Sequence, residues 1–391
     1  MRLCGGTLTE MAENIKVNDS KIILFGAGVI GTSITPALLV ALGLETSVVC
    51  CIDNDSARWG KGIIVGRRSV PICAPDVLCR LGGNAAVLIN ISRYADALEQ
   101  LEQMACTRLV DCYVMPALIM DHFHRGSKAG VIQTSRKPVI PKKIHYMWLG
   151  SGKLPEGLRQ CMDSWHRFCP DYEIVRWDES NYDIEKCCYM KQAYRCKKFG
   201  FVPDYARLDI LYRYGGIYMD TDVELIRNLD SLLYQGAFTS VEKWQVINFG
   251  GCSGAVAGHP SLEPFLRAWE QREFIRDDGT MDTLSSGYVD TRVALDNGYV
   301  LNGQNQTIMG MNIYRYDYFH PYDYMSGKTE LTDDTFAIHH FNGGWLDEQM
   351  KNADQQTRLR FESLCKKVET GRRKINDTVG NKSRNTREAQ E

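Results

Sequence analysis

The chain has 391 residues, of which 44% are hydrophobic and 24% charged, and its formal net charge is −2. This length suits two domains of about 100–200 residues each, and this composition is typical of an ordinary soluble globular protein. The near-neutral charge gives no reason to expect a nucleic-acid partner. The 14 cysteines have no regular spacing and include no Cys-x-x-Cys pair. This argues against a disulfide framework or a structural zinc site, so we expect reduced cysteines.

The start of the chain lacks the features that direct a protein into or across a membrane. Residues 1–20 have neither the basic start nor the apolar run of a signal peptide. The most apolar segment, residues 34–44, is shorter than the roughly 20 residues that span a bilayer. We therefore expect a flexible N-terminus over residues 1–20 and a cytoplasmic protein.

Residues 21–125 have the pattern of a Rossmann-like α/β domain. An apolar strand at 21–25 leads into a G-x-G-x-x-G sequence, a helix runs to about residue 44, and a second strand at 47–52 ends at an acid. This order is typical of a dinucleotide-binding unit, whose candidate ligand-binding residues here are Gly26, Gly28, Gly31 and Asp53. Further strands are predicted at 85–90 and 110–115, with a helix at 95–104. Two interpretations stay open: NAD-dependent oxidoreductase or epimerase chemistry, and a scaffold that catalyses nothing.

The rest of the chain divides by composition. Residues 126–139 are polar and rich in glycine, which is typical of a linker. A second α/β region covers residues 140–350. Residues 351–391 are expected to form a C-terminal helix and a disordered tail, in which residues 366–391 carry eight basic residues against four acids. Such a tail could make a peripheral contact with an anionic membrane.

The segment 202–222 contains the residues with the most chemical content. Asp204 and Arg207 are three apart, so they share one face of a predicted helix. A Gly-Gly turn then leads into a predicted strand, because glycine visits positive φ freely. Alternation along that strand puts three side chains on one side: Tyr218, Asp220 and Asp222. Together these groups predict a site for a divalent metal and a diphosphate, against the plain alternative of a surface turn with an internal Asp–Arg pair.

The region from Ile140 to Leu346 resembles glycosyltransferase family 32, whose members carry a DXD-containing sugar-binding region. The glucosylating toxin domains of clostridia have a similar Asp-x-x-Arg followed eleven residues later by Tyr-x-Asp-x-Asp, and this chain has the same spacing. Supporting matches are the sequence at 141–150, Gly258-His-Pro and the closing sequence at 337–345. The chain departs from the family at Asp290-Thr-Arg, where many relatives have a Gly-Pro-containing loop.

The resemblance implies an α/β domain of the GT-A type, retaining chemistry, and a Mn²⁺ or Mg²⁺ ion held by carboxylates as a Lewis acid. By this likeness Asp222 binds the metal, and Asp220 bridges the metal, the ribose and the donor sugar. Asp204 and Arg207 hold donor-sugar hydroxyls and complete the catalytic set. A histidine supplies a further metal ligand. Period 2 allows only one of His339 and His340 to face the site, and His340 is favoured because His-x-x-Gly resembles a metal-binding motif of related enzymes.

The same resemblance implies contacts to the rest of the donor. Trp148 is expected to stack on the base, and Trp345 to donate its indole N–H to the diphosphate, against the plain alternative that either is a core aromatic. Tyr218 and Asn248 are further candidate donor-binding residues.

The sequence thus predicts a Rossmann-like domain followed by a metal-dependent, retaining hexosyltransferase of GT-A type. Its donor is a nucleotide-diphosphate sugar, with UDP favoured, and its acceptor is a glycan or a lipid-linked oligosaccharide. Synthesis of a capsular polysaccharide, another surface polysaccharide or lipopolysaccharide fits best. Retention is expected through attack on the same face as the leaving phosphate. Two alternatives remain: an NAD-dependent nucleotide-sugar oxidoreductase or epimerase acting through the N-terminal domain, and a non-catalytic protein that binds a sugar nucleotide.

Overall fold

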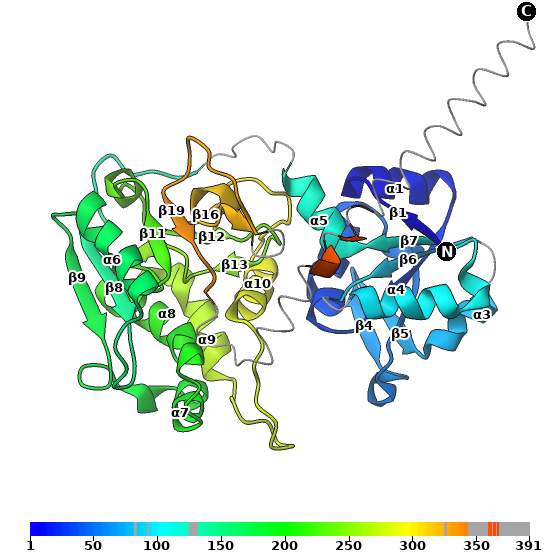
Figure 1. Ribbon diagram of the computed structural model, residues 1–391, viewed down its shortest axis with the longest axis horizontal. Coiled ribbons are helices and arrows are strands. Elements are labelled where there is room, and N and C mark those ends of the chain that lie inside the picture. The colour runs from blue at the N-terminus through cyan, green and yellow to red at the C-terminus, as the bar shows by residue number, and fades with distance from the viewer. Residues whose placement is uncertain are drawn as a thin grey trace, which may run out of the picture. The chain divides into compact units, whose positions relative to one another are not determined.

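The computed structural model describes residues 1–81, 84–91, 94–124, 132–323, 327–342, 359–361, 363–364 and 366. The chain forms two compact units (Figure 1). The first comprises Met1–Gly126 and Ala353–Glu391, and the second comprises Ser127–Asn352. Among the described residues, no helix is both long and apolar enough to cross a membrane.

The first unit is built on a largely parallel sheet. Over the described residues its strand order is β1-β7-β6-β2-β3-β5-β4, and all neighbours are parallel except β4 and β5. In β2 every residue after Lys21 is buried, as expected for a strand covered on both faces. The strands are β1 (Arg2–Cys4), β2 (Lys21–Phe25), β3 (Val48–Ile52), β4 (Gly62–Val65), β5 (Arg68–Cys73), β6 (Ala85–Ile89) and β7 (Asp111–Val114).

The expectation of a flexible N-terminus is wrong. Residues 2–4 form the edge strand β1 beside β7, and Arg2 pairs with Asp111 at 2.7 Å. Helix α1 begins with a capping box between Thr7 and Glu10 and buries an apolar face, so both its start and its packing are stabilised. The helices of this unit are α1 (Leu8–Val17), α2 (Thr35–Ala41), α3 (Leu78–Leu81), α4 (Tyr94–Gln103) and α5 (Met115–His124).

The cysteines depart from expectation at one pair. Cys79 in α3 and Cys106 after α4 form a disulfide, with their Cα atoms 5.2 Å apart. This separation lies within the range that a disulfide bridges. The expectation of reduced cysteines is therefore wrong for this pair. The adjacent Cys50 and Cys51, by contrast, are free thiols.

The second unit is built on a mixed sheet. Over the described residues the order is β15-β16-β12-β14-β10-β8-β9, with β13 paired to β12. β14 runs antiparallel to both of its neighbours, whereas β10, β8 and β9 are parallel to one another. The strands are β8 (Lys143–Met147), β9 (Glu173–Trp177), β10 (Gly216–Tyr218), β12 (Ala237–Val241), β13 (Ile247–Asn248), β14 (Ser253–Ala255), β15 (Gln306–Ile308) and β16 (Met311–Tyr314).

Two small strand pairs and five helices complete the described part of this unit. In Figure 1 the orange β19 lies beside β11, and their antiparallel register pairs Val223 with His339. The pairs are β11 (Val223–Leu225) with β19 (Ala337–His339), and β17 (Tyr322–Asp323) with β18 (Lys328–Thr329). The helices are α6 (Glu156–Phe168), α7 (Cys188–Arg195), α8 (Pro203–Tyr214), α9 (Glu263–Glu270) and α10 (Ser286–Asp296). The α/β class expected for both parts of the chain is confirmed.

The sheet of the second unit brings the predicted site residues to one edge. Because β8 and β10 are parallel, their carboxyl ends lie together, so Trp148 after β8 is near Asp220 after β10. The expected strand over Tyr218, Asp220 and Asp222 is wrong in its length. β10 ends at Tyr218, and the two aspartates lie in the turn before β11, closed by a hydrogen bond from Val223 N–H to the Asp220 carbonyl.

The segments between and after the two predicted domains are described only in part. Residues 126–131 of the expected linker lie outside the described residues. In the remainder, Ser135 and Val139 donate backbone hydrogen bonds to the carbonyls of Tyr234 and Leu233 in the second unit. Most of the expected C-terminal helix and basic tail, residues 351–391, also lies outside the described residues.

Candidate active site

The acidic segment is positioned by a buried helix and a pair of glycines. Helix α8 has Pro203 in its first turn, where the missing N–H costs nothing, and residues 204–211 are all buried. Gly215 and Gly216 then turn the chain directly into β10 with φ values of 63° and 96°. A Cβ on Gly215 would lie 2.9 Å from a backbone nitrogen and one on Gly216 2.8 Å from the His145 ring. Both positions therefore require glycine.

Asp204, Arg207 and Asp220 form a charge cluster in which Asp204 and Arg207 are buried and Asp220 is partly exposed. The Arg207 Nη2 atom lies 3.0 Å from Asp204 Oδ1 and 3.6 Å from Asp220 Oδ1. Burial raises the pKa of Asp204 to about 6, although the neighbouring Arg207 lowers it. The arginine thus links an acid of helix α8 with the first acid of the Asp-x-Asp sequence.

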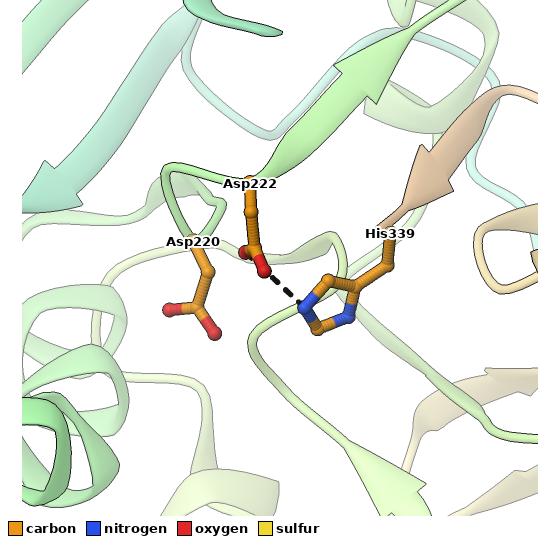
Figure 2. A group of neighbouring side chains, drawn as sticks. All are labelled: Asp220, Asp222 and His339. Atoms are coloured by element: carbon orange, nitrogen blue, oxygen red, sulfur yellow. Dashed lines mark ion pairs between the residues drawn. The ribbon is translucent and has the colours of Figure 1, made fainter. Parts of the chain in front are cut away.

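Asp220, Asp222 and His339 form a cluster suited to a metal ion. One ligand atom of each lies within 4.8 Å of those of the other two. Figure 2 shows the two carboxylates from the turn before β11 and the His339 ring from the end of β19 directed toward one another. His339 Nε2 is 3.3 Å from Asp222 Oδ1, and the Asn342 N–H donates to Asp222 Oδ2 at 2.9 Å.

The electrostatics of this cluster follow from its burial and its opposite charges. Burial alone would raise the pKa of Asp222, but His339 and the Asn342 N–H outweigh it and hold the pKa at about 2. Burial alone would lower the pKa of His339, but Asp222 raises it. Asp222 is therefore ionised at neutral pH, and two carboxylates with an imidazole can hold a divalent cation.

His340, which the sequence favoured as the metal ligand, does not join this cluster. Its Nε2 atom lies 2.9 Å from Glu224 Oε2, and its side chain is partly exposed. The two histidines follow Ala337, which is buried, and alternation along the strand turns His339 inward and His340 outward. The burial pattern of β19 in the folded chain distinguishes the two histidines, so the expected metal ligand is His339 and not His340.

The residues expected to contact the sugar-nucleotide donor differ in their surroundings. Trp148 lies at the end of β8 with its indole N–H donating to the Gly152 carbonyl at 2.8 Å. Its ring lines a pocket with residues 150–154, Arg159 and Arg176. Tyr218 is only 1% exposed, and its ring supports the Arg207 guanidinium at 5.8 Å. Trp345 lies outside the described residues.

Asn248 uses most of its side-chain amide within the protein. Its Nδ2 donates to Glu242 Oε1 at 2.8 Å, and its Oδ1 accepts from the backbone N–H groups of Gly250 and Gly251 at 2.8 and 2.9 Å. Both lone pairs of the carbonyl oxygen are thereby used. Asn248 therefore stabilises the turn that follows β13, and its amide oxygen is not available to contact the sugar-nucleotide donor.

Sequence reasoning did not assign Asp290 to the site. This carboxyl in α10 is 1% exposed and accepts from the Trp269 indole N–H at 2.9 Å. Burial raises its pKa to about 8, although Trp269 and Arg207 lower it. In the sequence Asp290 is notable only as a departure from the Gly-Pro-containing loop of the family. Its position near Arg207 results from the packing of α10.

The glycine motif of the first unit lies at the carboxyl ends of β2 and β3. A Cβ on Gly26 would meet the Ile91 side chain at 2.2 Å, and one on Gly31 the Gly26 carbonyl at 1.9 Å, so packing requires both. Gly28 has no neighbour within 4 Å of such an atom. The Asp53 carboxylate accepts from the Ala27 N–H at 2.7 Å. This acid therefore stabilises the loop itself.

Comparison with known proteins supports the resemblance to glycosyltransferases that the sequence shows. Residues 155–239 match the family described as "Glycosyltransferase sugar-binding region containing DXD motif". Inositol phosphoceramide mannosyltransferases 2 and 3 of Schizosaccharomyces pombe are 30% and 33% identical over 142 and 148 residues. Each alignment covers 35% of this chain, with 40% and 39% of the relative.

The chain therefore spans about two fifths of the length of the curated relatives it matches. Among solved structures, the PaToxG glycosyltransferase aligns with a TM-score of 0.33 at 20% identity, over 40% of this chain and 69% of that one. The family match includes Asp204, Arg207, Asp220 and Asp222. The resemblance is confirmed: the second unit of this chain contains a DXD-type sugar-binding region of the glycosyltransferase kind.

Proposed function

We propose that the second unit is a metal-dependent glycosyltransferase that moves a sugar from a nucleotide-diphosphate sugar to a glycan or a lipid-linked oligosaccharide. The observation that carries this proposal is the convergence of Asp220, Asp222 and His339 beside the Asp204–Arg207 pair. The family match over the same acids supports it. A surface turn with an internal ion pair would not account for a buried histidine directed at two carboxylates.

The ligand set fits Mn²⁺ or Mg²⁺. Carboxylate oxygens suit both ions, and the imidazole of His339 favours Mn²⁺. Once bound, the cation supplies Lewis-acid neutralisation of the leaving diphosphate. Asp222 and His339 would hold it, and Asp220 would link it to the sugar side of the site.

The sugar side of the site would depend on the charge cluster of Asp204, Arg207 and Asp220. Arg207 lies between the two carboxylates, and Asp204 and Asp220 would accept hydrogen bonds from donor hydroxyls. Trp148 would stack on the base at the edge of the sheet. On the sequence alone, Trp345 would donate its indole N–H to the diphosphate.

The finer specificity is also proposed. By resemblance the reaction retains the configuration of a hexose, and the acceptor attacks from the face of the leaving phosphate. The sequence favours UDP as the nucleotide, whereas two relatives are inositol phosphoceramide mannosyltransferases. A mannosyl donor is thus a second candidate. A cytoplasmic role in surface polysaccharide or lipopolysaccharide synthesis, with the basic tail at a membrane, completes the proposal.

The direct test is slow donor hydrolysis without an acceptor. The full chain is incubated in Mn²⁺ with a panel of UDP- and GDP-sugars, and release of the nucleoside diphosphate is measured. One donor is expected to react, and Asp222→Asn should abolish its cleavage. Asp55→Asn, in the other Asp-x-Asp sequence of the chain, is the matched control and should behave as the wild type. Absence of both binding and cleavage for every donor would contradict the proposal.

A further inference from the structure

The turn between β13 and β14 touches both sides of the candidate metal site. Its two glycines are held by a single atom, Asn248 Oδ1, which accepts both of their backbone N–H groups. The Gly250 carbonyl in turn accepts the Asp220 N–H at 2.8 Å. The conformation of this turn therefore fixes the backbone that carries the first aspartate of the cluster.

Gly250 is packed directly against the charged groups. A Cβ at this position would lie 2.1 Å from Asp220 Oδ2 and 2.9 Å from Arg207 Nη1. The Asp220 carboxylate therefore occupies the space that a side chain at position 250 would need. The position of this turn therefore limits the orientations open to the Asp220 carboxylate.

Gly251 is packed against the histidine side of the site. A Cβ here would lie 1.9 Å from the His320 ring, whose Nε2 pairs with Ser240 Oγ at 2.9 Å. The His320 ring is 5.3 Å from the ring of His339. The same turn therefore limits the positions available to the candidate imidazole ligand.

Glu242 determines which way the Asn248 amide faces. The carboxyl is 8% exposed and accepts from Asn248 Nδ2, which leaves the amide oxygen directed at the two glycines. A flipped amide would place Nδ2 against two N–H donors and Oδ1 against an acceptor. Each of those contacts would be repulsive, so Glu242 selects one orientation.

We propose that Glu242 and Asn248 are positioning residues that hold Asp220 and His339 in the geometry of the metal site through the Gly250–Gly251 turn. This inference rests on the proposed metal-dependent function. Glu242 itself is not proposed to contact the substrate. Loss of a group that orients metal ligands commonly alters metal affinity by about 10–100-fold. Asn248 acts on Asp220 through Gly250, and Glu242 acts through Asn248.

Direct Mn²⁺ binding to the full chain, measured by titration calorimetry without any sugar nucleotide, tests the inference apart from catalysis. Glu242→Ala and Asn248→Ala should each weaken Mn²⁺ binding by about 10-fold or more. Glu242→Gln should stay within about threefold of the wild type, because a glutamine carbonyl can still accept from Asn248. The double variant should be no weaker than Asn248→Ala alone, since both residues act through one turn.

Asn312→Ala is the matched control. Asn312 is a buried amide that, like Asn248, bonds within the protein, and its partners Gln133 and Gln235 lie outside the acidic turn. Its loss should lower thermal stability and leave Mn²⁺ affinity unchanged. The inference is overturned if Glu242→Ala binds Mn²⁺ as the wild type does, if Glu242→Gln is as weak as Glu242→Ala, or if Asn312→Ala weakens Mn²⁺ equally. A chain that binds Mn²⁺ in this pattern but cleaves no donor would refute the proposed function and leave the positioning role supported.

Discussion

Replacing Asp204 by asparagine should stabilise the protein and inactivate it. Because the pKa of Asp204 rises from the usual 3.8 to about 6 on folding, ionising this carboxyl costs the native state ~3 kcal/mol relative to the unfolded chain. Asparagine keeps the shape and the oxygen that faces Arg207 but carries no charge. The advantage of Asp204→Asn should therefore be absent below pH 3.8, grow between pH 3.8 and 6, and be constant above pH 6.

Urea unfolding followed by tryptophan fluorescence measures this difference, since six of the seven tryptophans belong to the second unit. We expect the variant to be more stable by ~3 kcal/mol at pH 7.5 and by ~1 kcal/mol at pH 4.5. Donor cleavage should fall by about 100-fold or more, because the sugar loses a positioning contact. Asp296→Asn, in an exposed pair with Arg292, should change stability by less than about 0.5 kcal/mol at either pH. Equal stability of wild type and Asp204→Asn at pH 7.5, or an advantage that does not depend on pH, would refute the reasoning.

Three further variants test separate parts of the site. His339→Ala should weaken Mn²⁺ binding in calorimetry by more than about 100-fold, beyond the range for indirect partners, whereas His340→Ala should not; the reverse order would contradict the ligand assignment. Gly250→Ala should leave the circular dichroism spectrum intact and lower kcat by about 10–100-fold, since its Cβ would displace the Asp220 carboxylate; an unchanged kcat would show that the turn tolerates a methyl group. Trp148→Ala should remove ~1–3 kcal/mol of base stacking and raise the donor KM by about 5–150-fold, and an unaltered KM would exclude stacking at this position.

Local sequence predicted the elements whose signals are strong and short in range. The strand at 21–25 and its glycine turn, and the helix with Asp204 and Arg207, lie where the pattern placed them. Apolar runs, helical spacing and glycine pairs determine such elements through contacts within a few residues. Residues 8–17 carry the same signals, with a capping box at Thr7 and Glu10 before an amphipathic run, and they form helix α1 where a flexible N-terminus was expected.

The composition of the metal cluster could not be read from spacing alone. Asp220 and Asp222 were predicted to meet through strand alternation, yet they meet through a turn after β10. The choice of His339 over His340 depends on the register of β19 against β11, which joins segments more than 100 residues apart. Asp290 contacts Trp269 of α9 through the packing of α10, and Glu242 contacts Asn248 across the paired strands β12 and β13, and neither contact is marked by a motif in the sequence. Register and packing between distant segments are tertiary properties.

The central claim is that Asp220, Asp222 and His339 hold one divalent cation against a nucleoside diphosphate. A crystal of the full chain grown with Mn²⁺ and UDP, measured at a wavelength where manganese scatters anomalously, tests it most directly. The account predicts one anomalous peak about 2.0–2.3 Å from an oxygen of each aspartate and from the His339 Nε2 atom. A peak coordinated instead by His340 and Glu224, or nucleotide bound away from the three residues, would contradict it.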